Sequence, residues 1–275
     1  MKNEDEDLQP TILESNIDFP TNESISEPKF ETKFSDFLVN TGKLENNQFE
    51  TFLDLDRFRK ITEKFQIKDI TKIENEIVSL SETHPETRRI FFADGDAIII
   101  PQEKLIKIFE SACQYFKKLT RISIYGSIKS LKTKSAANLA ELKNRKLGII
   151  YMGMETGDDE VYRSINKFGS PAENVETCLK IKQSGIKVNS TIIIGLGGKK
   201  YSKQHSVNTA KMLNEAQPEQ IAALTLMIVP GTPIHKMLHD KKFVLPGKFE
   251  LLEELSLLIK NLAEFHESPS KTTAD

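Results

Sequence analysis

Short glycine-rich or acidic segments follow five apolar runs in this sequence. They read Asp94-Gly95-Asp96, Tyr125-Gly126-Ser127, Gly153-Met154-Glu155-Thr156-Gly157, Gly195-Leu196-Gly197-Gly198 and Pro230-Gly231-Thr232-Pro233. Glycine lets a ligand approach the backbone closely, and carboxylates accept hydrogen bonds from an ammonium group or from ribose hydroxyls. Each segment alone is a weak signal, because glycine-rich turns also join strands to helices in proteins without a ligand. Their repetition predicts a small-molecule site.

The glycine run at 195–198 admits a second interpretation. Lys199 and Lys200 follow it directly, and backbone amides beside a lysine can hold a phosphate. The spacing is not that of a Walker motif, which argues against a nucleoside triphosphatase. A phosphate-binding barrel enzyme stays open as an alternative.

Other catalytic and metal-binding motifs find no support in the sequence. The five histidines are scattered, and no zinc-protease motif or Gly-x-Ser-x-Gly segment occurs. The two cysteines, Cys113 and Cys178, lie far apart inside helical patterns, whereas disulfide frameworks and zinc sites need clustered sulfur ligands. We expect both to be buried structural thiols.

The segments that must position these residues alternate between strand and helix. The apolar, β-branched runs predict strands at residues 89–93, 121–125, 148–152, 187–194 and 220–229. Helical patterns occupy residues 102–118, 134–145, 159–165, 171–184, 202–216 and 249–265. Strands that are apolar throughout and separated by helices favour an α/β fold with a parallel sheet, either a barrel or a doubly wound sheet. Ligands of such folds bind at the carboxyl ends of the strands.

The ends of the chain differ from this central part. Residues 1–47 are polar and acidic, which predicts a disordered tail, and residues 265–275 are expected to be loose. A helical pattern starts at Phe49 and a second one carries Ile70, Ile73 and Ile77. The net charge of -2 argues against nucleic-acid binding, no apolar run reaches the roughly 20 residues that span a bilayer, and the acidic start is unlike a signal peptide. We expect a cytoplasmic protein.

Four of these segments, taken in order with their strands, resemble the radical S-adenosylmethionine (radical SAM) superfamily. They are FFADGDA at 91–97, YMGMETG at 151–157, TIIIGLGG at 191–198 and LTLMIVPGTP at 224–233. The nearest likeness is to proteins related to oxygen-independent coproporphyrinogen oxidase and the Elongator catalytic subunit. The resemblance implies a partial, TIM-like (βα)6 barrel over residues 48–264 with S-adenosylmethionine as cofactor.

The resemblance also implies roles for individual residues. Asp94, Gly95 and Asp96 look like the family's segment that holds the methionine amino group. Glu155 sits where a polar residue meets the ribose or carboxylate. Ile193 and Gly195 correspond to the strand that contacts adenine, with the backbone from Met227 to Val229 beside the same base.

One departure from the family concerns sulfur. The family holds a four-iron cluster on three closely spaced cysteines in a loop after the first strand, and the open iron binds the amino and carboxylate groups of the cofactor. Here the aligned stretch, residues 48–60, reads QFETFLDLDRFRK and has no cysteine. Thiolates are the ligands of such clusters, so the sequence does not support a metal site or assign a catalytic residue. It predicts a degenerate enzyme that retains cofactor binding.

A second departure concerns the start of the barrel. No apolar run precedes Phe49, so the first strand is expected to be missing, which would leave the strand at Arg89 on an open edge. Either the acidic N-terminal segment or a protein partner is expected to cover that edge, or the chain is a decayed remnant of an enzyme. The alternative function is therefore a scaffold, or half of a split enzyme that pairs with an intact relative.

Overall fold

The computed structural model describes residues 50–53, 68–93, 95–230 and 232–262, all of which belong to one compact unit, Leu44–Asp275. The predicted tails at 1–47 and 265–275 lie outside the described residues. In the described part of the chain, no helix is both long enough and apolar enough to cross a membrane.

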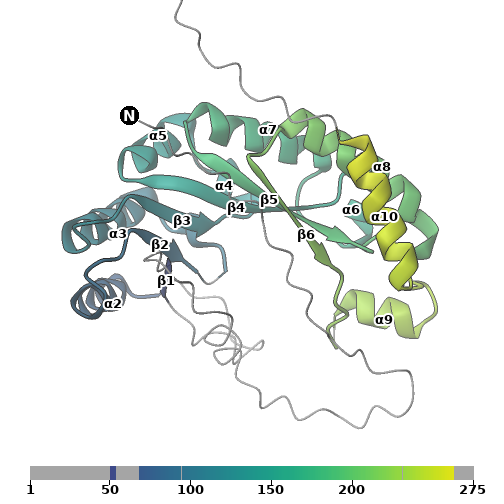
Figure 1. Cartoon of the computed structure of the whole chain (residues 1–275), viewed down its shortest axis with the longest axis horizontal. Coiled ribbons are helices and arrows are strands. Elements are labelled where there is room, and N and C mark those ends of the chain that lie inside the picture. The colour runs from purple at the N-terminus through teal and green to yellow at the C-terminus, as the bar shows by residue number, and fades with distance from the viewer. Residues whose placement is uncertain (1–49, 54–67, 94, 231, 263–275) are drawn as a thin grey trace, which may run out of the picture. The chain divides into compact units, whose positions relative to one another are not determined.

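Six parallel strands lie side by side in the order in which they occur in the chain (Figure 1). They are β1 Glu50–Leu53, β2 Arg89–Phe92, β3 Arg121–Tyr125, β4 Leu147–Glu155, β5 Lys187–Ile194 and β6 Gln220–Thr225. In a doubly wound sheet the strand order reverses at a switch point, so this sequential order identifies the barrel type and confirms the predicted fold class. Within the described residues, β1 and β6 each pair with one neighbour only.

Helices connect the strands, and the long ones lie where the sequence predicts them. Their bounds are α2 Ile70–Thr83, η2 Ala97–Ile99, α3 Gln102–Tyr115, α4 Ile128–Lys132, α5 Ala136–Asn144, α6 Asp159–Ser164, α7 Pro171–Gln183, α8 Gly198–Ala216, α9 Pro233–His239 and α10 Lys248–Asn261. The short helices η2, α4 and α9 were not predicted, because one or two turns do not show a helical period. Ser135 and Ser170 begin α5 and α7 as N-caps, each accepting a hydrogen bond from a backbone amide three residues on.

Strand β1 corrects the prediction that the first barrel strand is missing. Glu50–Leu53 pairs in parallel with β2, with Glu50 beside Arg89. The strand has only four residues, and Phe52 shares a three-residue spacing with Leu55 and Phe58 that favours a helix. The predicted helix at Phe49 is therefore wrong for residues 50–53. The edge expected to be open at Arg89 is covered by the chain itself.

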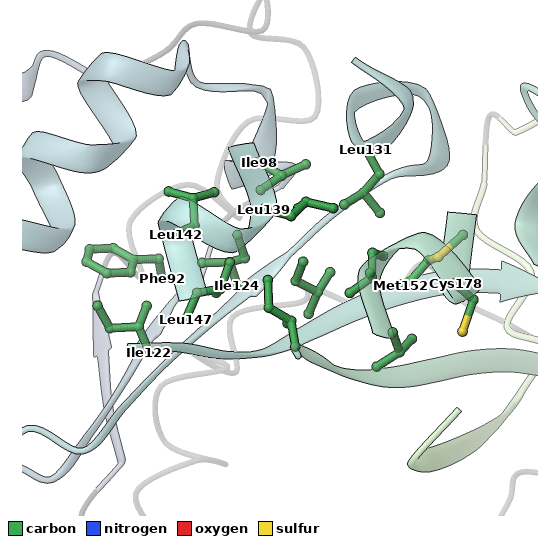
Figure 2. Close-up of a cluster of buried hydrophobic side chains, with 14 of the residues drawn as sticks. Phe92, Ile98, Ile122, Ile124, Leu131, Leu139, Leu142, Leu147, Met152 and Cys178 are labelled. Carbon is green, nitrogen blue, oxygen red and sulfur yellow. The ribbon is translucent and has the colours of Figure 1, made fainter. Parts of the chain in front are cut away.

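The core lies between the sheet and the helices on one of its faces. Alternate residues of each strand point to the same face, and on that face Ile122, Ile124 and Met152 are fully buried. They belong to one buried cluster with Leu139 and Leu142 of α5 (Figure 2), in which Met152 lies on the side of Cys178. Each such side chain stabilises the fold by about 1.5–3 kcal/mol through burial. The helices on this face thus bury one side of the sheet.

The opposite face of the sheet carries an aromatic cluster on three neighbouring strands. Phe91, Tyr125 and Tyr151 come from β2, β3 and β4, and the ring of Phe91 lies 4.7 Å from that of Tyr125 and 4.9 Å from that of Tyr151. Both contacts are edge-to-face, the arrangement that aromatic quadrupoles favour.

Candidate functional site

A pocket of about 350 Å³ opens at the carboxyl ends of β4, β5 and β6. Glu155 and Ile193 line it from β4 and β5, and Leu196 and Leu226 follow β5 and β6. Helix α9 contributes Met237. Most of the lining is apolar, which suits a flat hydrophobic ligand oriented by few polar groups.

The polar side of this pocket is an ion pair between Glu155 and Lys167. Glu155 Oε1 lies 2.5 Å from Lys167 Nζ, which also donates to the carbonyl of Gly153 at 2.7 Å. The two side chains are 19% and 22% exposed. Glu155 has a φ of 63° at an irregularity in the β4 register, a left-handed conformation that costs about 1–2 kcal/mol for a residue other than glycine. Lys167 therefore holds in the pocket the carboxylate of a residue whose backbone is strained.

The turn after β4 explains how Lys167 returns to its partner. Gly157 packs so closely on α8 that a Cβ there would lie 2.2 Å from the carbonyl oxygen of Asn208. Asp158 then begins α6 by accepting hydrogen bonds from the amides of Glu160 and Val161. Burial opposes ionisation of Asp158, but these bonds and those from neighbouring side chains outweigh it and hold its pKa below the usual value. The turn and α6 are thus fixed, and Lys167 follows directly.

Asp96, predicted to hold an amino group, is engaged elsewhere. Its Oδ1 accepts a hydrogen bond from the amide of Ser127 at 3.0 Å. Its Oδ2 accepts from the hydroxyls of Ser127 and Ser130, both at 2.5 Å. Asp96 thereby ties the loop after β2 to the start of α4. Gly95 is exposed with a φ of 66°, and Asp94 lies outside the described residues.

The glycine loop after β5 is tied to α10 by a buried carboxylate. Gly195 has a φ of 86°, and its amide donates to Glu254 Oε1 at 2.6 Å. The Ser202 hydroxyl donates to Glu254 Oε2 at 2.5 Å. Glu254 has a side-chain exposure of 0%. The Gly195 amide, which would bind a phosphate in a phosphate-binding barrel enzyme, therefore already donates its hydrogen bond to a carboxylate of the chain itself.

The two lysines of that alternative also have partners. Lys199 pairs with Glu250 at 2.9 Å, and its amide donates to the carbonyl of Val244. Lys200 donates to the hydroxyl of Tyr201. The first turn of α8 therefore contacts α10 through Lys199, and neither lysine is arranged as in a phosphate site.

His205 extends this buried network toward β4. Its Nδ1 lies 2.7 Å from the Thr156 hydroxyl and its Nε2 lies 3.1 Å from the carbonyl oxygen of Ile193. Glu254 is 3.5 Å from the same Nε2. Burial lowers the pKa of His205, and the Glu254 carboxylate opposes that shift. The network links the tops of β4 and β5, where Glu155 and Ile193 lie.

Sequence reasoning missed His205 and Glu254. A signal existed for Glu254, since it lies three residues after Leu251 and four before Leu258, within the apolar stripe of its helix. A carboxylate on a buried helix face must find hydrogen-bond donors there. No comparable signal marked His205.

The structure brings only part of the predicted site together. Glu155 and Ile193 line one pocket, and Gly195 adjoins it in the chain. Met227 is 80% exposed and Val229 is 43% exposed, and neither side chain lines the pocket. Leu226 lies there instead, because its amide continues the pairing of β6 by donating to the carbonyl of Ile194.

Both thiols lie at the other end of the sheet. Cys113 Sγ is 3.8 Å from the carbonyl oxygen of Arg145, just before β4 begins. Cys178 Sγ is 3.6 Å from that of Ala216, just before β6. Cys178 is fully buried, as predicted, and burial raises its pKa to about 12, whereas Cys113 is only partly buried. Among residues 50–53, 68–93, 95–230 and 232–262, no grouping of His, Cys, Asp or Glu suits a metal ion. The two separate thiols of Cys113 and Cys178 do not fit an iron–sulfur cluster held by several thiolates.

Comparison with known proteins adds independent findings. The model of the Radical SAM superfamily matches residues 48–213. Protein MJ0486 of Methanocaldococcus jannaschii is 26% identical over 149 residues, covering 54% of this chain and 45% of that protein. Biotin synthase of Buchnera aphidicola subsp. Schizaphis graminum is 28% identical over 145 residues, covering 53% and 41%. The chain spans less than half the length of these relatives.

Solved structures share the fold. Coproporphyrinogen III oxidase (HemN) from Escherichia coli superposes with a TM-score of 0.55 at 17% identity, covering 70% of this chain and 45% of that one. An N-terminally deleted Elp3 from Methanocaldococcus infernus gives a TM-score of 0.53 at 12% identity, covering 71% and 50%.

Proposed function

The chain belongs to the radical SAM superfamily, and we propose that it binds S-adenosylmethionine in the pocket above β4, β5 and β6 without cleaving it by radical chemistry of its own. The observation that carries the second part is the placement of sulfur. The sequence has two cysteines, and both thiols lie beside the amino ends of strands. Residues 54–67, which follow β1, read DLDRFRKITEKFQI and contain no cysteine.

The first part of the proposal is supported by the pocket itself. Ile193, Leu196 and Leu226 supply an apolar wall for a purine, and Glu155 supplies an acceptor for ribose hydroxyls. Supplied with a cluster and an electron, this family uses S-adenosylmethionine as a radical source. Without thiolates to hold iron, the residues described here bind and orient the ligand only.

Calorimetric titration with S-adenosylmethionine tests the binding. Replacing Ile193→Ala removes apolar contact in the pocket, and we expect an affinity loss of about tenfold, or ~1.4 kcal/mol. The matched control is Ile259→Ala, at a position that is 57% exposed on α10, and its affinity should equal that of the wild type. An equal loss in both variants, or no binding at all, would reject the site.

Anaerobic reconstitution with iron and sulfide tests the chemistry. We expect no stoichiometric cluster and no thiolate-to-iron charge-transfer absorption, because the two cysteines lie beside different strands and such a cluster needs several thiolates together. A brown protein that converts S-adenosylmethionine to 5′-deoxyadenosine unaided would overturn this part of the proposal.

A second candidate function is that of a partner for an intact relative that carries the cluster cysteines. The observation that favours it is strand β6, which pairs with β5 alone in the part of the chain that the structure describes. Leu224 is 54% exposed and Met227 is 80% exposed, and an apolar strand with one unpaired edge invites β-strand addition. This replaces the edge at Arg89, which β1 covers. Co-expression with such a relative should yield a complex that Leu224→Lys weakens, and a monomer in light scattering under those conditions would reject the candidate.

A further inference from the structure

We propose that the pocket recognises the nucleoside end of its ligand and does not distinguish the methionyl end. S-adenosylmethionine, S-adenosylhomocysteine and 5′-methylthioadenosine should therefore bind with similar affinity. This inference rests on the proposed function, and it specifies which part of the ligand the pocket recognises.

The first reason is that Asp96, the described one of the two acids predicted to hold an amino group, already has hydrogen-bond partners. A carboxylate offers about four lone-pair sites. Asp96 uses three of them to accept hydrogen bonds from the Ser127 amide, the Ser127 hydroxyl and the Ser130 hydroxyl. Because Ser127 is also the N-cap of α4, releasing Asp96 to a ligand would disrupt the start of that helix. Asp96 therefore has a structural role that competes with an incoming ammonium group.

The second reason is the charge balance of the pocket. S-adenosylmethionine carries a sulfonium cation, whereas the other two ligands have a neutral sulfur. The carboxylate that could attract the sulfonium is Glu155, and Lys167 neutralises it from 2.5 Å. The pair has no net charge, so it offers little Coulomb attraction to a third charge nearby. Among the described residues that line the pocket, no net charge therefore favours the charged cofactor.

The third reason is what the pocket does provide. Ile193, Leu196 and Leu226 form an apolar surface, and the second oxygen of Glu155 has no hydrogen-bond partner among the described residues. An apolar wall and one free acceptor match a base and a ribose. The volume of about 350 Å³ lies near the lower end of the ~300–1,000 Å³ typical of small-molecule sites, which also fits a nucleoside.

Calorimetric titration of the full chain with each of the three ligands is the direct test. We expect the three Kd values to agree within about threefold. If S-adenosylmethionine binds more than tenfold tighter than 5′-methylthioadenosine, the site reads the methionyl end and the inference is wrong, while the proposed function stands. If none of the three binds, the proposed function itself fails.

A charge variant tests the physical reason separately. Lys167→Met leaves Glu155 unpaired, so the affinity ratio of S-adenosylmethionine to S-adenosylhomocysteine should rise at least threefold in favour of the sulfonium. Lys203→Met is the matched control, because Lys203 is exposed and does not line this pocket; its ratio should equal that of the wild type. Circular dichroism confirms folding of both variants. An unchanged ratio in folded Lys167→Met would overturn the charge argument and the inference with it.

Discussion

Replacing Glu254→Ala should destabilise the protein more than any other single change at a carboxylate of α10. The side chain is 0% exposed and accepts hydrogen bonds from the Gly195 amide at 2.6 Å and the Ser202 hydroxyl at 2.5 Å. Alanine leaves the buried Gly195 amide and the part-buried Ser202 hydroxyl without this acceptor, and a buried orphan donor costs about 1–3 kcal/mol. Removing the carboxylate also ends its own desolvation cost, so we expect a net loss of about 3 kcal/mol in the free energy of unfolding.

Urea denaturation followed by circular dichroism measures this loss. For a domain of this size, a loss of about 3 kcal/mol corresponds to a fall of roughly 6–12 °C in Tm. Glu253→Ala is the matched control, since the Glu253 carboxylate is next in the chain and exposed. This variant should change the free energy of unfolding by less than about 0.5 kcal/mol. Glu254→Gln keeps an acceptor for the Gly195 amide and should lose about 1 kcal/mol.

A loss of less than about 1 kcal/mol in Glu254→Ala, or a loss equal to that of Glu253→Ala, would refute a stabilising role of these hydrogen bonds. Either result would mean that water or a rearranged side chain satisfies the Gly195 amide. The loop after β5 would then be positioned by helix packing alone.

Three further outcomes follow from the same contacts. Cys113 is partly buried and should react with a thiol reagent in the folded protein. Cys178 is buried, with its pKa raised to about 12, and should react only after unfolding. Equal reaction rates of the two cysteines, measured by mass spectrometry, would contradict this. Asp96→Ala should cost about 2–3 kcal/mol in urea denaturation, since the hydrogen bonds that Ser127 donates to the charged carboxylate are lost. An unchanged stability would contradict this structural role of Asp96. Burial lowers the pKa of His205 in the folded protein below 6.5, so the unfolded chain binds more protons at this residue and the free energy of unfolding should fall as the pH drops below about 6.5. His205→Gln should flatten that part of the stability profile. An unchanged profile would contradict the role of the buried imidazole.

Much of the fold could be predicted because its signals are local. Apolar β-branched runs such as residues 187–194 and 121–125 match the observed strands, and the helical period marks α3 and α7 within a few residues. The pairing of Glu155 and Ile193 in one pocket also follows from sequence, since parallel strands end at one edge of the sheet.

Local sequence signals could not distinguish a barrel from a doubly wound sheet, because the difference depends on which strands pair. Only the observed strand order from β1 to β6 decides between them. Strand β1 was mistaken for a helix, because Phe52 fits the spacing of the following residues while the partner that makes Glu50–Leu53 a strand is β2, about 40 residues away.

The amino-acid sequence by itself determined where the strands and helices form, that strand ends carry acids and glycines, and that no cysteines cluster. The tertiary structure decided what those acids do. Asp96 meets Ser127 from 31 residues away, and Glu254 meets Gly195 from 59, so each carboxylate acquires donors that its own neighbourhood does not contain. Hydrogen bonding acts at about 3 Å regardless of chain distance, which is why a side chain that looks free in sequence can be fully satisfied in the fold.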